Sequence, residues 1–165
     1  MPLMRRLETH ECSGNSMRLW WKVKSPLRIA FNFALIYSAR FLPSTRLKNS
    51  LYGLSGARVG RGATLGLGAV LDIFFPELVS IGEETLVGYK TVILGHEFLQ
   101  GEYRTGRVEI GSRVMIGANC TILPGIRIGD GASVSAMSLV NRDIPAGEKW
   151  GGVPARKIFG KGKGV

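Results

Sequence analysis

The sequence contains little cysteine and little histidine. Its two cysteines, Cys12 and Cys120, form no C-x-x-C pair. This spacing argues against a disulfide framework and against a cysteine-based zinc site, and it fits a reducing compartment, the cytoplasm. The two histidines are His10 and His96. We therefore expect that the protein needs no metal.

Acidic residues are absent from a long N-terminal stretch. None lies between Glu11 and Asp72, although the whole chain carries a net charge of +10. That stretch holds nine basic residues: Arg18, Lys22, Lys24, Arg28, Arg40, Arg46, Lys48, Arg58 and Arg61. Such a basic field suits anionic lipid, nucleic acid or an acidic ligand. Because no known nucleic-acid module is recognisable, we expect no nucleic-acid partner.

The apolar run in the N-terminal region is too short to cross a bilayer. Residues 29–39 are interrupted by Asn32 and Ser38 and bracketed by Arg28 and Arg40. A membrane-spanning helix needs roughly 20 apolar residues. No small-residue cleavage site follows the run, so it does not fit a cleaved signal peptide either.

From residue 59 onward an aliphatic residue returns every six positions, with two breaks. Seven of these twelve residues are followed at once by glycine, and all are Val, Leu or Ile: Val59, Leu65, Leu71, Ile81, Val87, Ile93, Ile110, Ile116, Ile122, Ile128, Val134 and Val140. A period of six matches neither a helix nor a single strand. It is typical of a parallel β-helix, an all-β solenoid of hexapeptide repeats.

Three hexapeptides make one coil of three flat sides, and the spacing locates four coils. They begin at Val59, Ile81, Ile110 and Ile128, with four extra residues after the first coil and eleven after the second. Inward residues of successive coils should stack at strand spacing, for example Ile110 over Ile128 and Ile116 over Val134. Cys120 takes a small inward position, which predicts a buried thiol.

The chain before the repeat falls into two parts. Residues 1–16 show no periodicity and are expected to be a mobile leader, with Met17 as an alternative start. Residues 17–56 predict a basic, aromatic helical segment. In it, Pro26 suits the first turn of a helix that runs to about Phe41.

A second short helix is expected after Ser44, which offers an N-cap. Leu47 and Leu51 would share one face of this helix, and Gly53 would end it. Two interpretations of the helical segment stay open. In the first, the segment packs within the protein, as a cap over the first coil or as a packing surface for a neighbouring subunit. In the second, it is an interfacial anchor that makes peripheral contact with the inner face of the membrane through residues 17–52.

The second break in the repeat marks the expected functional site. His96 stands immediately before the eleven-residue excursion, loop 99–109. A neutral imidazole is well suited to act as a general base near pH 7, and the alternative is an ordinary solvated turn residue. Glu97 beside His96 and Tyr103 within the loop are candidate substrate-binding residues. Solenoids that tolerate such an excursion usually carry function there.

The C-terminal half of the chain resembles a known enzyme family. The motifs ILPGIRIGDGA (122–132), NRDIPAG (141–147) and GGVPAR (151–156) occur in the order and spacing of the hexapeptide-repeat O-acetyltransferases of the maltose and galactoside type. The resemblance covers residues 81–158. It implies a left-handed β-helix over residues 57–158, followed by a basic tail at 159–165, and a homotrimer with active sites between subunits.

The resemblance also implies roles for individual residues. His96, after Gly95, matches the family's general base, although it stands two residues earlier in its hexapeptide than in the sugar acetyltransferases. Ala118 and Ala136 match positions whose backbone meets the pantetheine arm of acetyl-CoA, the acyl donor. Three further positions match cofactor-binding residues of the family: Asn141, Arg142 and Arg156.

The acceptor does not carry over from the family. The sugar acetyltransferases hold it with an asparagine at a position that is Gly66 here, and their N-terminal acceptor-binding segment is absent. Asp72 either supplies polarity nearby, as a candidate substrate-binding residue, or solvates a corner.

The leading hypothesis is transfer of an acetyl group from acetyl-CoA to a hydroxyl of a saccharide-like acceptor, with His96 as the base. N-acetylation of an amine and a non-catalytic β-helix scaffold remain alternatives. A γ-type carbonic anhydrase shares the fold but needs three histidines for its zinc, and the repeat has only one.

Overall fold

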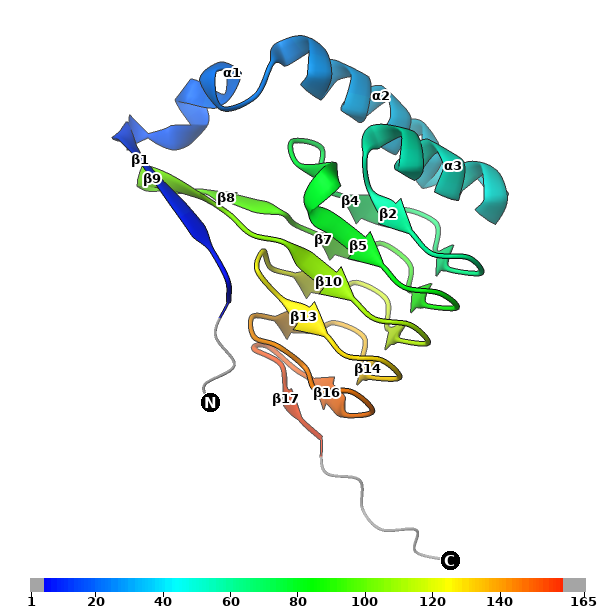
Figure 1. Cartoon of the computed structure of the whole chain (residues 1–165). Helices are drawn as coiled ribbons and strands as arrows, with labels where there is room; N and C mark the ends of the chain where they lie inside the picture. Colours follow the sequence, from blue (N-terminus) through cyan, green and yellow to red (C-terminus); the bar gives the residue numbers. More distant parts are fainter. Residues whose placement is uncertain (1–4, 159–165) are drawn as a thin grey trace, which may run out of the picture.

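The computed structural model describes residues 5–158, so residues 1–4 of the expected leader and the basic tail at 159–165 lie outside it. The central part of the chain is a parallel β-helix, with helices at one end and a three-stranded sheet at one side (Figure 1). Its three faces are three parallel sheets. The described part thus confirms a hexapeptide-repeat β-helix with an N-terminal helical segment.

Each face takes one strand from every coil. The first face contains β2 (Arg58–Val59), β5 (Val79–Ile81), β10 (Val108–Ile110) and β13 (Arg127–Ile128). The second contains β3 (Thr64–Leu65), β6 (Leu86–Val87), β11 (Met115–Ile116), β14 (Ser133–Val134) and β16 (Lys149–Gly151), and the antiparallel β17 (Arg156–Lys157) adds to it. The third contains β4 (Val70–Leu71), β7 (Val92–Ile93), β12 (Thr121–Ile122) and β15 (Leu139–Val140).

The register of the coils follows the six-residue period. Ile110 pairs with Ile128 and Ile116 with Val134, as the spacing predicted. Eleven of the twelve repeat aliphatics are buried, and Val59 in the first coil is partly buried. The expected core position of Cys120 is also confirmed, because the residue is 1% exposed. Stacked aliphatic ladders therefore form the core.

The recurring glycines allow the coils to approach one another. A Cβ built on Gly117 would lie 2.6 Å from the Cα of Ala136 in the next coil, and one on Gly66 would lie 2.8 Å from the backbone nitrogen of Tyr89. Real Cβ atoms do not come so close to backbone. Glycine follows the inward aliphatic because the next coil passes directly against that position.

The N-terminal helices lie across the first coil (Figure 1). They are the short η1 (Ser16–Leu19) and α1 (Trp20–Val23), then α2 (Pro26–Phe41) and α3 (Thr45–Ser55). The bounds predicted for α2 are confirmed, as is the Ser44 N-cap of α3. One expectation for α3 was wrong: the helix runs past Gly53 to Ser55, and its C-cap is Gly56, whose φ is 110°.

Polar side chains of the helices bind carbonyl oxygens of the first coil. Lys48 Nζ donates to the carbonyl of Leu65 at 2.8 Å, and Tyr52 Oη donates to that of Ala69 at 3.0 Å. Asn49 donates in the same way to Ala63 at 2.8 Å. Burial lowers the pKa of Lys48 and raises the pKa of Tyr52 to about 12. The interpretation of the segment as a cap over the first coil is thereby confirmed.

The eleven-residue excursion is an antiparallel β-hairpin that stands out from the coils (Figure 1). It consists of β8 (His96–Phe98) and β9 (Gln100–Thr105), so it begins earlier than the expected loop 99–109. A third strand, β1 (Glu8–Asn15), pairs with the outer edge of β9. The expectation of a mobile leader is therefore wrong for residues 8–15, which the edge of the hairpin holds in a sheet.

The other end of the β-helix closes with a partial coil. Ile144 bridges to Ile128, and Trp150 on β16 stacks over Val134. The Trp150 ring is 6% exposed, and its Nε1 donates to Glu148 at 2.8 Å. This burial makes Trp150 a packed core residue rather than a ring that stacks on a ligand. None of the helices within residues 5–158 has the length and hydropathy that a membrane crossing requires.

Candidate functional site

Both breaks in the repeat lie at the same corner of the β-helix. The four extra residues of the first break follow β4 and include the short η2 (Pro76–Leu78). The excursion of the second break follows β7, which pairs directly with β4 through Leu71 and Ile93. Residues that are some twenty positions apart in sequence thus meet where the third face turns into the first.

His96 and Asp72 form the polar centre of this corner. The Nδ1 atom of His96 lies 2.5 Å from Oδ2 of Asp72. The His96 side chain is 12% exposed and that of Asp72 is fully buried. Of the two sequence interpretations of Asp72, solvation of a corner does not agree with this burial. Its carboxylate instead faces the imidazole.

Backbone amides hold the Asp72 carboxylate in place. Oδ1 accepts hydrogen bonds from the amides of Phe74 at 2.8 Å and Phe75 at 2.9 Å, while Oδ2 accepts from Gly95 at 2.7 Å and from His96 at 3.1 Å. Burial alone would raise the pKa of Asp72. The hydrogen bond and charge of His96 and the amides of Phe75 and Gly95 outweigh that effect, and the pKa is lowered. Asp72 is therefore ionised at neutral pH.

An ionised Asp72 fixes the protonation pattern of the ring. A carboxylate only accepts hydrogen bonds, so Nδ1 of His96 must carry a proton to bind it. In the neutral ring the lone pair then resides on Nε2. Nε2 has no hydrogen-bond partner among the described residues. This geometry prepares Nε2 to take up a proton.

Aromatic rings surround the imidazole. Its centroid lies 4.7 Å from that of Phe98, 4.8 Å from Phe74 and 5.6 Å from Phe75. Phe98 comes from the hairpin, and the other two come from the first break. Sequence reasoning missed all three, although two consecutive phenylalanines inside an interruption of the repeat were an available signal.

The two other candidates of the hairpin, Glu97 and Tyr103, contact residues near the N-terminus of the chain. Glu97 makes a bidentate ion pair with Arg5, with both N–O distances at 2.6 Å. The Tyr103 ring stacks on His10 at 4.5 Å between centroids. Both side chains therefore have partners within the chain, and these partners come from the region that was expected to be a leader.

The five cofactor candidates are spread over different parts of one chain. Ala118 and Ala136 lie at the corner between the second and third faces, where the amide of Met137 donates to the Ala118 carbonyl at 2.9 Å. Asn141 and Arg142 follow β15, at the same corner as His96 but two coils away. Arg156 is exposed on β17 and donates to its own neighbour, the Ala155 carbonyl, at 2.9 Å. Ala118 and Ala136 are thus neighbours in successive coils, whereas Asn141 and Arg142 lie at a different corner.

Asn141 has an unused polar atom. Its Oδ1 is buried and has no hydrogen-bond partner within the described residues. Arg142 beside it is half-buried and likewise has no partner there. As for metals, residues 5–158 contain no group of three or more His, Cys, Asp and Glu side chains that could hold an ion.

Comparison with known proteins agrees with this fold. The family described as bacterial transferase hexapeptide (six repeats) matches residues 107–142. The chain is 46% identical over 160 residues to "Putative acetyltransferase YvoF" of Bacillus subtilis (strain 168), covering 96% of this chain and 93% of that protein. The chain belongs to the hexapeptide-repeat acetyltransferase family.

Solved structures show the same fold at low sequence identity. A hexapeptide-repeat acetyltransferase from Vibrio cholerae complexed with acetyl-CoA has a TM-score of 0.64 and 20% identity, covering 81% of this chain and 86% of that one. A galactoside acetyltransferase in complex with coenzyme A has a TM-score of 0.61 and 24% identity, covering 81% and 80%.

Proposed function

We propose that the protein transfers an acetyl group from acetyl-CoA to a hydroxyl of a saccharide-like acceptor, with His96 as the general base. The observation that carries this proposal is the 2.5 Å contact between His96 Nδ1 and the buried carboxylate of Asp72. It orients the ring and leaves Nε2 available. Family membership supplies the reaction class, and the acetyl-CoA and coenzyme A complexes of the structural neighbours support the donor.

In the proposed reaction, Nε2 of His96 takes the proton of the acceptor hydroxyl as its oxygen attacks the thioester carbonyl. The C–O bond forms, and the carbonyl oxygen carries the negative charge of the tetrahedral intermediate, which backbone amides stabilise. When the C–S bond breaks, the imidazolium returns the proton to the departing thiolate. Asp72 stabilises the imidazolium between the two proton transfers and keeps Nδ1 protonated throughout.

We propose a homotrimer in which the acetyl-CoA groove joins neighbouring subunits. Its support is the resemblance of the chain to the hexapeptide-repeat O-acetyltransferases, which implies active sites between subunits. In this trimer, the backbone at Ala118 and Ala136 meets the pantetheine arm, while Asn141 and Arg142 lie near the cofactor. Arg156, as a planar guanidinium, suits the nucleotide phosphates. Glu97 and Tyr103 border the acceptor site from the hairpin.

The test is release of free thiol from acetyl-CoA in the presence of sugars, amines and lipid-linked saccharides. We expect turnover with a hydroxyl acceptor and a loss of about 10²–10⁴ in rate for His96→Ala. The control is His10→Phe, which keeps a ring to stack on Tyr103 and should retain most of the activity. Turnover with amines alone would mean that the acceptor group is an amine and not a hydroxyl. Failure of the protein to bind acetyl-CoA in calorimetry would overturn the proposal.

A further inference from the structure

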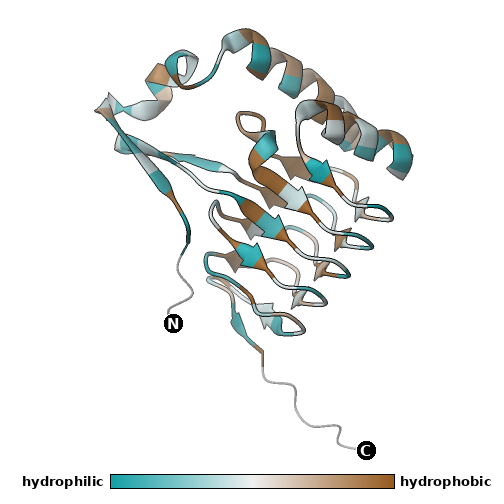
Figure 2. Cartoon of the chain, in the orientation of Figure 1, coloured by the Kyte–Doolittle hydropathy of each residue, from teal (hydrophilic) through white to brown (hydrophobic). Residues whose placement is uncertain are grey.

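The outward face of α2 is almost entirely apolar. The helix buries Ile29, Asn32, Ile36 and Ala39 against the first coil. Its opposite side carries large side chains that are about half exposed or more: Leu27 (84%), Phe31 (48%), Phe33 (50%), Tyr37 (50%) and Phe41 (55%). Hydrophobic segments on this surface helix are visible in Figure 2. A surface helix normally presents polar residues on that side.

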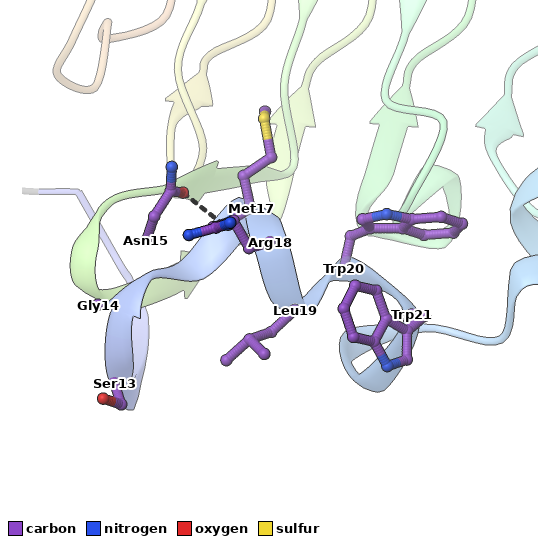
Figure 3. Close-up of a pocket in the computed structure, with 8 residues that line it drawn as sticks. All are labelled: Ser13, Gly14, Asn15, Met17, Arg18, Leu19, Trp20 and Trp21. Atoms are coloured by element: carbon purple, nitrogen blue, oxygen red, sulfur yellow. Dashed lines mark hydrogen bonds between the residues drawn. The ribbon is translucent and has the colours of Figure 1, made fainter.

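Two tryptophans extend the apolar surface beyond α2. Trp20 is 37% exposed and Trp21 is 50% exposed, and their rings meet edge to face at 6.3 Å. They line a shallow hollow of about 820 Å³, together with residues 13–15 and 17–19 (Figure 3). The hollow lies at the turn from β1 into η1 and α1. We call Trp20, Trp21 and the outward side chains of α2 the aromatic face.

Uncompensated positive charge borders the aromatic face. Arg18 and Lys22 are exposed next to the tryptophans, and neither has a partner among the described residues. Lys24, in contrast, pairs with Glu77 and lies over the Phe75 ring. The sequence provides no acidic residue between Glu11 and Asp72 to neutralise the others.

We propose that the aromatic face binds the surface of an anionic phospholipid bilayer. Trp, Tyr and Phe side chains suit the boundary between headgroups and acyl chains, and flanking Arg and Lys suit anionic headgroups. A second copy of the chain is a poorer occupant, because Arg18 and Lys22 of both copies would approach one another without counter-charges. This peripheral contact needs no membrane-spanning helix and does not depend on the proposed function.

The arrangement also places the bilayer next to the hairpin that carries His96. Ser16, the first residue of η1, is buried and bound to Leu99 at the tip of the hairpin. Its amide donates to the Leu99 carbonyl at 3.2 Å, and its Oγ accepts from the Leu99 amide at 2.9 Å. The segment that would contact lipid and the hairpin are thus one connected unit.

The test is co-sedimentation of the full chain with phosphatidylglycerol vesicles and with phosphatidylcholine vesicles. We expect binding to the anionic vesicles that weakens as salt is raised. Arg18→Gln and Lys22→Gln should each lower the partition coefficient about fivefold, the equivalent of about 1 kcal/mol. Trp21→Ala and Phe31→Ala should lower it about five- to tenfold.

Matched controls lie at the opposite end of the β-helix. Lys149→Gln removes an exposed positive charge from β16, and Ile158→Ala truncates an apolar side chain that is 40% exposed. Both variants should bind vesicles like the parent. The proposal is overturned if the parent does not sediment with anionic vesicles, or if the aromatic-face variants bind as well as the controls. It is also overturned if Trp21→Ala and Phe31→Ala change the oligomeric mass but not vesicle binding, which would assign the face to a second copy.

Discussion

Asp72 and His96, which are 24 residues apart in sequence, lie at one corner of the β-helix with Oδ2 and Nδ1 2.5 Å apart. The contact exists because the coil that begins with Val59 and the coil that begins with Ile81 break at the same corner. The interruption of the repeat thus provides the acid–base pair.

Replacement of Asp72 by Asn should impair catalysis through the ring of His96. The amide cannot act as a carboxylate, so Nδ1 no longer needs to carry the proton and the imidazolium loses its counter-charge. We expect a fall in the rate of thiol release of about 10²-fold or more, with acetyl-CoA binding retained. A rate within about threefold of the parent would show that Asp72 does not position the base.

The same substitution makes a prediction about stability and pH. The pKa of Asp72 is lowered in the folded protein from its ordinary value of 3.8. Its stabilising contribution is therefore complete above that value and is lost as the pH falls through the folded-state pKa. Asp72→Asn should cost about 1–3 kcal/mol of unfolding free energy at neutral pH. Urea unfolding should show the difference shrinking below about pH 4; a difference that grows in acid would contradict the assignment.

Two glycine-to-alanine substitutions should have opposite signs. At Gly117 a Cβ would lie 2.6 Å from the Cα of Ala136, so Gly117→Ala should destabilise by about 1–3 kcal/mol. At Gly53, inside α3, a Cβ meets nothing within 4 Å, so Gly53→Ala should stabilise by about 0.5–1 kcal/mol. Thermal unfolding of the two variants measures both effects. Similar shifts in the unfolding temperature of both variants would show that the close approach of the coils does not require glycine at position 117.

The aliphatic ladder should dominate stability. Ile116 is fully buried between Val87 and Val134, and Ile116→Ala should cost about 2–5 kcal/mol. The control is Leu54→Ala on α3, where the side chain is 63% exposed and the change should stay within about 0.5 kcal/mol. Chemical unfolding of both variants is the measurement. An Ile116→Ala cost equal to that of Leu54→Ala would mean that the core repacks freely.

A protein that begins at Met17 should keep its coils and lose the order of the hairpin. The truncation removes β1, the partner of β9, and with it the Arg5–Glu97 ion pair. We expect faster hydrogen exchange of the β9 amides and a rate lower by about 10²-fold, since the hairpin carries the base. Unchanged exchange and turnover would contradict this role of β1.

The control for the truncation is Arg6→Gln. It removes only the ion pair with Asp143, in which the Arg6 side chain is 50% exposed. Exposed pairs contribute little, about 0–1 kcal/mol, so this variant should behave like the parent. The comparison separates the loss of strand pairing from the loss of one surface charge.

The repeat was predictable from sequence because its period reflects a single repeated contact. Every inward aliphatic sits over another, so the spacing between Ile110 and Ile128 was sufficient to predict their pairing. His96 was found because it adjoins the larger break. Its partner Asp72 was placed near the site but without its hydrogen bond, since that contact depends on two breaks sharing one corner.

The strand β1 was missed for a different reason. Its sequence, ETHECSGN, has no clear alternation, and only two of its residues are even partly buried. An edge strand held by backbone pairing and by end contacts such as Arg5 to Glu97 leaves little hydropathy signal. Its structure depends on the hairpin, which lies about ninety residues later.

The hydrogen bonds between the helices and the first coil limit how far the solenoid can extend. Lys48, Asn49 and Tyr52 occupy carbonyl oxygens that another coil would otherwise bind. At the opposite end, the antiparallel β17 covers the last parallel strand of the second face. An uncovered parallel edge is a template for end-to-end growth, and repeat proteins need caps to remain discrete. The helical segment therefore protects the chain against fibre formation, and variants that loosen it should aggregate along the coil axis before they lose their coils.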